Sequence, residues 1–238
     1  MFSIFILDSL KLVLYFIVCA SAALATRKLL TIPEEVHRKI LHFIMVGSIF
    51  VFLYSFSSWQ NAALAAAVFA IVIYPVLSIA ERFDGYSKLL AERDSGEIKR
   101  SLILAFGMFA AVVSVCWGLL GAKYLALAVI LGWGLGDATA ALVGKKYGKH
   151  HLTGRFIDGK KSLEGTAAMF VVAFLAITSV LYLNNILPGY GCLTISTISA
   201  AVCAVVELHT KNGLDTLTCP AATLVVMVLL VHVWVGLL

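Results

Sequence analysis

The sequence predicts an all-α protein, a polytopic bundle of about seven or eight transmembrane helices with the N- and C-termini outside. Composition is the first observation: 61% of the residues are hydrophobic, only 13% are charged, and the mean hydropathy is +1.00. A soluble domain has roughly a quarter of its residues charged. Repeated apolar segments and an uneven distribution of basic residues are the other two observations. We expect a single integral membrane domain over residues 1–238.

Eight apolar segments approach the roughly 20 residues that a helix needs to cross the hydrocarbon core of a bilayer. More basic residues follow the first segment than precede it, the reverse of a cleavable signal peptide, so we expect a retained span. Glycines interrupt the fifth segment, which leaves seven crossings and a re-entrant segment as an alternative. The expected spans cover residues 10–26, 40–56, 61–80, 101–119, 123–143, 163–183, 191–207 and 216–237.

The basic residues alternate between the two sides of this arrangement. All but two of the 18 lysines and arginines, Lys11 and Lys123, fall in every second connection. Cytoplasmic loops carry the excess of basic residues, so four connections should face the cytoplasm. In a bacterium, this would be a protein of the cell inner membrane. The net charge of +5 then lies on the inner side, where anionic headgroups or an anionic substrate are the natural partners. No basic domain with interleaved aromatic residues is present, so we expect no nucleic-acid partner. No pattern indicates an oligomeric state.

An aspartate near the cytoplasmic end of the fifth segment is the first candidate site residue. Asp137 lies in "LGWGLGDATAALVG", residues 131–144. An ionisable residue within a span is costly and marks a functional site by default. Gly136 precedes it, Gly144 follows two turns later on the same face, and glycine lets a ligand approach the backbone closely. A packing seam of small residues with an aspartate at the interface explains the same pattern, and both interpretations stay open.

The stretch "GKKSLEGT", residues 159–166, places charged and hydroxyl groups at the start of the sixth apolar segment. Lysines and a hydroxyl beside a helix N-terminus are typical of an anion-binding site, which favours Lys161 and Ser162. The Glu164 carboxylate would then need a cation, such as Mg²⁺ or a nearby lysine. The alternative is a lysine pair that follows the charge rule and a glutamate that complements the helix dipole. We prefer this alternative for Lys160 but not for Glu164.

Two further stretches bring ionisable residues to the same membrane depth. In "TIPEEVHRKILH", residues 31–42, Arg38 and His42 share a helix face with Lys39 beside them, and arginine suits bidentate phosphate binding. Ordinary i,i+4 ion pairs explain Lys39 equally well. In "ELHTKNGLDTLTCP", residues 207–220, Glu207 closes one apolar segment and Asp215 opens the last, where it could also cap the helix.

Four carboxylates are thus expected at one boundary of the membrane. Carboxylate oxygens suit Mg²⁺, which usually also binds the phosphates of a substrate. Phosphoryl transfer needs mainly positioning and charge neutralisation, which the basic side chains would complete. The sequence therefore predicts a site for phosphate and a divalent cation; its metal ligands are expected to be Asp137, Glu164, Glu207 and Asp215.

Four motifs in order resemble those of the CTP-dependent lipid kinases, the group that includes dolichol, phytol and farnesol kinases and fungal-type diacylglycerol kinase. They are "HRKILH", "GDATAALVGKKYG", "GKKSLEGT" and "ELHTKNGLDTLTCP", over roughly residues 35–225. The last motif has a threonine, Thr216, where the family usually has asparagine. The resemblance implies CTP as the phosphate donor and functional roles for Arg38, Lys39, Asp137, Gly144, Lys161 and Glu164. The carboxylates themselves indicate Mg²⁺ as the metal. We expect the catalytic residues to be Asp137, Glu164, Arg38 and His42. We expect the nucleotide or its phosphates to be bound by Arg38, Lys39, Gly136, Gly144, Lys145, Lys161, Ser162 and Thr166.

Three function classes follow from these observations. The leading hypothesis is a kinase that transfers the γ-phosphate of CTP to a membrane lipid alcohol, either a polyprenol- or phytol-type isoprenoid or diacylglycerol, at the cytoplasmic boundary of the bilayer. The nearest enzymatic alternative is a cytidylyltransferase that makes a CDP-lipid, because the family is distantly similar to such enzymes. A lipid or small-molecule transporter ranks lower, because the charges cluster at one surface and no pseudo-repeat is visible.

Overall fold

The computed structural model describes residues 2–154, 157, 159, 161–211 and 213–236. Over these residues the fold is helical, and eight helices are long and apolar enough to cross a membrane. The predicted all-α fold class is thereby confirmed. The chain forms two compact units, Met1–Ser114 and Val115–Leu238. One membrane domain over the whole chain, and termini on the outer side, remain predictions.

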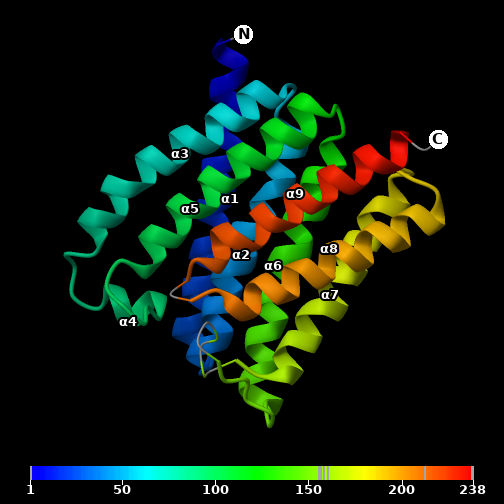
Figure 1. The fold of residues 1–238 in the computed structure, drawn as a ribbon. Coiled ribbons are helices and arrows are strands. Elements are labelled where there is room, and N and C mark those ends of the chain that lie inside the picture. Colours follow the sequence, from blue (N-terminus) through cyan, green and yellow to red (C-terminus); the bar gives the residue numbers. More distant parts are fainter. Residues whose placement is uncertain (1, 155–156, 158, 160, 212, 237–238) are drawn as a thin grey trace. The chain divides into compact units, whose positions relative to one another are not determined.

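The first unit contains four long helices and one short one: α1 (Phe2–Leu29), α2 (Glu34–Ser55), α3 (Trp59–Ala80), α4 (Tyr86–Leu90) and α5 (Glu97–Val113). Figure 1 shows α3 and α5 side by side, and α4 at the end of the unit where α1 meets α2. A π-helical turn, η1 (Ser114–Leu119), follows α5.

Aromatic side chains from four helices build the core of the first unit. Phe106 of α5 lies 4.5 Å from the ring of Phe69 on α3, 5.6 Å from Phe16 on α1 and 6.0 Å from Phe52 on α2, between ring centroids. Such tilted and edge-on pairs add to the free energy gained by burying the rings. The Tyr15 hydroxyl also donates to the carbonyl of Ile44 at 2.8 Å and joins α1 to α2.

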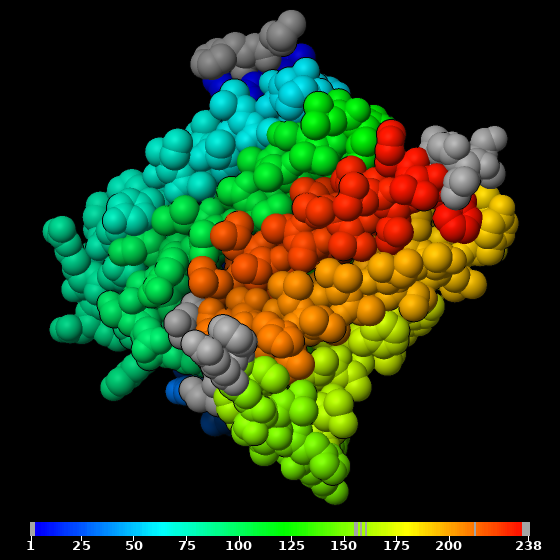
Figure 2. All heavy atoms as spheres, in the orientation of Figure 1, coloured from blue at the N-terminus to red at the C-terminus, as the bar shows by residue number. Residues whose placement is uncertain are grey.

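The second unit consists of α6 (Lys123–Tyr147), α7 (Leu163–Leu183), α8 (Gly189–His209) and α9 (Asp215–Gly236). The central helix is α6, which contacts each of the other three and has most of its residues buried. Figure 2 shows α8 (orange) and α9 (red) packed along one face of this unit. In Figure 1 the α6–α7 loop and the α8–α9 connection lie at the same end, which is where the predicted site residues of this unit are found.

The helix bounds differ from the expected spans mainly where charges stand near the ends. The first helix begins at Phe2 instead of near residue 10, because Lys11 pairs with Asp8 one turn earlier at 2.7 Å and the helix continues through both charges. The second helix begins at Glu34, six residues before the expected span. The glycines of the fifth segment do not break α6, which is a continuous helix of 25 residues. The short helix α4 lies in the connection between the third and fourth expected spans.

Candidate functional site

The α6–α7 loop of the second unit folds back on itself and places Lys161 and Ser162. Its two ends pair: the Leu152 amide donates to the Lys161 carbonyl, and the Leu163 amide to the His150 carbonyl, both at 2.9 Å. His151 and Ser162 form an isolated antiparallel bridge between them. The first turn of α7 therefore starts from a fixed position beside the end of α6. Lys160 lies outside the described residues.

Ser162 caps α7. Its backbone is extended, and its hydroxyl accepts a hydrogen bond from the Gly165 amide at 3.2 Å. This satisfies one of the amide groups that a helix leaves unpaired at its first turn. The Thr166 hydroxyl donates to the Ser162 carbonyl at 3.1 Å. Ser162 is almost fully buried, so its hydroxyl has a structural role here, and phosphate binding by Ser162 and Thr166 stays a prediction.

Lys161 forms an ion pair with Glu207, the residue near the end of α8. The ammonium donates to the Glu207 carboxylate and, at 3.2 Å, to the Glu207 carbonyl oxygen. Only 6% of the Glu207 side chain is exposed, against 23% for Lys161. A carboxylate this deeply buried needs a charged partner, and Lys161 supplies it. Sequence reasoning proposed both residues but did not pair them.

Two more carboxylates of the predicted site act on the same lysine. Partial burial by itself would lower the pKa of Lys161, but the neighbouring Glu207 carboxylate, together with Asp215 and Asp137, raises that pKa above the usual lysine value. These three acids come from α8, α9 and α6, so helices distant in sequence bring negative charge to one point. Asp137 is itself buried, with 6% exposed. The Asp215 carboxylate also accepts from the Thr216 amide at 3.1 Å at the start of α9.

Glu164 has a different partner from the other acids. Its carboxylate accepts from the His150 ring nitrogen Nδ1 at 2.7 Å and from the His150 amide at 3.3 Å. The Glu164 carboxylate thus contacts an imidazole, from a residue that the sequence analysis had not selected, and a cation beside Glu164 stays a prediction. His150 and Glu164 lie at opposite ends of the α6–α7 loop, and no local pattern in "GKHH" predicts that they pair.

Glycines and small residues form the contact between α6 and α7. A Cβ atom added to Gly136 would lie 2.9 Å from the Met169 sulfur, and one added to Gly144 would lie 3.2 Å from the Ser162 hydroxyl oxygen. Gly165 faces them from α7. The packing interpretation of these glycines therefore has direct support, while nucleotide binding by Gly136 and Gly144 stays a prediction. Lys145 is exposed in the last turn of α6, where it complements the helix dipole.

The remaining predicted residues belong to the first unit. Arg38 donates to Glu97 of α5 at 2.6 Å and, more weakly, to Glu35 one turn earlier at 3.4 Å. Arg93 joins the same group, with its guanidinium 2.8 Å from Glu35 and its amide donating to Glu97 at 2.7 Å. We refer to Glu35, Arg38, Arg93 and Glu97 as the four-residue ion network. The Arg38 guanidinium thus already binds carboxylates, and phosphate binding by Arg38 stays a prediction.

Lys39 and His42 lie on α2 and are partly exposed. The ring of His42 is 6.2 Å from that of Phe43, measured between centroids. Arg93 and Glu97 were missed in the sequence analysis because they stand outside the four motifs, in the connection before α5 and at its first residue. The available sequence signal was the high number of both acidic and basic residues between positions 81 and 100.

The donor set suits a hard cation, but its arrangement is centred on a lysine. Among the described residues, no three His, Cys, Asp or Glu side chains are grouped closely enough to hold a metal ion. Mg²⁺ is usually held by only one or two carboxylates together with substrate phosphates and water. Asp137 and Asp215 supply two carboxylates of the required type, whereas the Glu207 carboxylate is bound to Lys161. The four-carboxylate metal site stays a prediction.

Fold and site together define a multi-pass α-helical membrane protein in which three acids surround a lysine. The chain is 29% identical over 216 residues to the phytol kinase of Synechocystis sp. (strain ATCC 27184 / PCC 6803 / Kazusa). The aligned region covers 86% of this chain and 83% of that protein. This similarity confirms the resemblance seen in the motifs and supports a lipid kinase family of the polyprenol- and phytol-kinase type. No protein-family model matches the chain, and no solved structure is detectably similar to it.

Proposed function

We propose that this protein is a CTP-dependent, Mg²⁺-assisted kinase that phosphorylates an isoprenoid alcohol of the phytol or polyprenol type in the membrane. The supporting observation is the similarity to a phytol kinase over most of the chain. The cluster of Lys161 with Glu207, Asp215 and Asp137 is consistent with it, because phosphoryl transfer depends on charge neutralisation and positioning.

In this proposal the oxygen of the lipid hydroxyl attacks the γ-phosphorus of CTP, the bond to the β-phosphate oxygen breaks, and CDP leaves. The hydroxyl proton passes to a base, for which one of the carboxylates of the second unit is the candidate. Lys145 and Lys161 of the same unit would hold the phosphates. Asp137 and Asp215 would hold Mg²⁺, which when bound would neutralise charge on the phosphates. The roles of Arg38, Lys39 and His42, which belong to the first unit, stay predictions.

The depth of these residues in the membrane favours a lipid acceptor. Asp137 lies toward the end of an apolar helix, and Glu207 and Asp215 lie at the ends of two others. An alcohol whose chain lies among the apolar helices presents its hydroxyl at the level where these helices end. A water-soluble alcohol would gain nothing from this placement. We also propose that this end faces the cytoplasm, from the distribution of basic residues.

Purified protein in detergent tests the proposal when it is given Mg²⁺ and CTP labelled at the γ-phosphate. Phytol, farnesol, a polyprenol and diacylglycerol are offered separately, and the lipid products are extracted and separated. The expected result is label on an isoprenoid monophosphate, with less transfer from ATP. Label on no lipid would refute the kinase assignment.

A parallel reaction with CTP labelled at the α-phosphate distinguishes the cytidylyltransferase alternative. A kinase leaves that label on CDP, whereas a cytidylyltransferase transfers it to the lipid. Because detergent removes the two compartments, any product also separates an enzyme from a transporter. A variant with Lys146→Gln, which removes an exposed lysine beside the proposed phosphate ligand Lys145, serves as the matched control and should retain full activity.

A further inference from the structure

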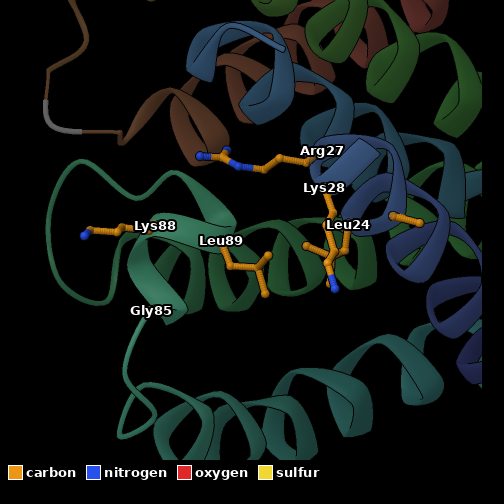
Figure 3. Close-up of a pocket in the computed structure, with 7 residues that line it drawn as sticks. Leu24, Arg27, Lys28, Gly85, Lys88 and Leu89 are labelled. Carbon is orange, nitrogen blue, oxygen red and sulfur yellow. The ribbon is translucent and has the colours of Figure 1, made fainter. Parts of the chain in front are cut away.

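A cavity in the first unit is not used by the proposed reaction. It measures about 700 Å³, is open to the outside, and lies between the C-terminal end of α1 and the short helix α4. Figure 3 shows Leu24 and Lys28 of α1 facing Leu89 of α4, while Lys88 points away from α1. The lining residues are Leu24, Ala25, Arg27, Lys28, Gly85, Lys88 and Leu89.

Positive charge is the first property of this cavity. Arg27, Lys28 and Lys88 line it, and none of the described residues in its wall is acidic. The Arg27 nitrogen Nη1 is buried and has no hydrogen-bond partner among the described residues. Arginine stays protonated in proteins, so Arg27 and the two lysines bring positive charge that an anionic ligand in the cavity would neutralise. A phosphate oxygen suits arginine and lysine equally.

Apolar surface beside the cations is the second property. Leu24, Ala25 and Leu89 form the rest of the wall, apart from Gly85. Large apolar side chains around it are exposed: Leu29 is 81% exposed and Phe83 69%. A ligand with an anionic head and hydrocarbon tails matches both properties, because its tails can continue along the apolar surface of α1. A free anion would use the cations and leave that surface uncovered.

We infer that this cavity binds the phosphate headgroup of an anionic membrane phospholipid. Basic pockets between helices at a membrane boundary commonly hold such headgroups. In this arrangement Lys28 and Arg27 contact the phosphate from α1. Lys88 swings in from α4 over the open side, and α4 is thereby held against α1. The inference concerns binding alone and does not depend on the proposed kinase activity.

Native mass spectrometry of the detergent-solubilised protein tests this inference. The protein is mixed with phosphatidylglycerol, with phosphatidylcholine, with phytyl phosphate or with inorganic phosphate, and the bound adducts are counted. The expected result is preferential retention of phosphatidylglycerol. Charge-removing variants Arg27→Gln, Lys28→Gln and Lys88→Gln should each weaken retention roughly fivefold. Arg82→Gln removes an exposed cation from the same connection, outside the cavity, and should bind as the wild type does.

The outcomes separate the sources of phosphate. Equal retention of phosphatidylcholine, or unchanged binding in the three cavity variants, would overturn the inference. Displacement of the lipid by inorganic phosphate alone would assign the site to a free anion, and stronger binding of phytyl phosphate would assign it to a phosphorylated isoprenoid. Both results would also overturn it. Leu89→Gln, which keeps the charges and removes apolar surface, should weaken lipid binding without creating affinity for inorganic phosphate.

Discussion

Lys161 and Glu207 stand 46 residues apart in the chain and form an ion pair that ties the α6–α7 loop to the end of α8. The lysine also donates to the backbone carbonyl of Glu207, so the contact fixes the helix end as well as the side chain. Asp137 and Asp215 add negative charge around the same ammonium. The pair therefore lies at the centre of a group of three acids from α6, α8 and α9.

Removing one member of this pair should destabilise the protein more than removing both. In Glu207→Gln the partly buried lysine loses its counter-charge, and in Lys161→Met the buried carboxylate does, at a cost of about 3–5 kcal/mol each. Lys161→Met combined with Glu207→Leu should be closer to the wild type in thermal unfolding in detergent, because the ammonium and its nearest carboxylate are removed together. Additive losses in the double variant would contradict this account.

The same pair should make stability fall at alkaline pH. The folded-state pKa of Lys161 is raised above its ordinary value of 10.5, so folding favours the protonated lysine. The stabilisation is then fully present below about pH 10.5 and is lost as pH rises through the folded-state pKa. The difference in free energy of unfolding between the wild type and Lys161→Met should shrink over this range. A constant difference would show that the ammonium charge contributes nothing.

Gly165→Ala should weaken the contact between α6 and α7. The new Cβ would lie 2.9 Å from the Ala140 carbonyl oxygen and 3.3 Å from the Gly144 Cα, both backbone atoms that cannot turn aside. We expect a loss of about 1–3 kcal/mol in the free energy of unfolding. Gly107→Ala on α5 is the matched control, because its Cβ would meet nothing within 4 Å and alanine favours the helix. Equal effects of the two variants would show that the α6–α7 contact tolerates a methyl group.

Glu97→Gln should destabilise the first unit through the four-residue ion network. Glu97 accepts from the Arg38 guanidinium and from the Arg93 amide, and charged hydrogen bonds of this kind contribute about 1.5–3 kcal/mol. The exposed Glu34→Gln, one residue before Glu35, removes the same charge and should be nearly neutral. A double-mutant cycle of Arg38→Gln with Glu97→Gln measures the coupling directly. Zero coupling would show that the Arg38–Glu97 contact contributes nothing to stability.

Much of the fold was predictable because a membrane span is a local property of the sequence. Hydropathy over about 20 residues identified the eight helices, and only charged ends such as Asp8 and Lys11 displaced their bounds. The cap at Ser162 is also local, since a serine before an apolar run commonly accepts from the third residue on. The sequence analysis assigned Ser162 to anion binding instead.

The partners of the site residues were not predictable in the same way. Lys161 with Glu207 and Arg38 with Glu97 depend on which helices pack together, and no periodicity in a single segment contains that information. His150 with Glu164 depends on how the α6–α7 loop folds back. Each acid or base was identified by its type and depth in the membrane, whereas its role in the folded chain required the tertiary structure.

Asp137→Asn should abolish phosphate transfer while leaving the protein folded. Asp137 is buried, so the isosteric amide keeps the packing of α6 and removes only the charge that would bind Mg²⁺. Loss of a group of this kind typically lowers the rate by at least about 100-fold. The measurement is transfer from labelled CTP to phytol over a range of Mg²⁺ concentrations, together with thermal unfolding.

The pattern of loss separates a catalytic role for Asp137 from a packing role. If Asp137 only supports α6, Asp137→Asn should lower the unfolding temperature and the activity together, and added Mg²⁺ should restore neither. If Asp137 is a ligand for the metal, stability should be retained and the Mg²⁺ requirement should rise. Thr139→Ala, two residues on in α6, removes a hydroxyl that donates to the Leu135 carbonyl and serves as the control for local packing. Full activity in Asp137→Asn would exclude this carboxylate from the reaction.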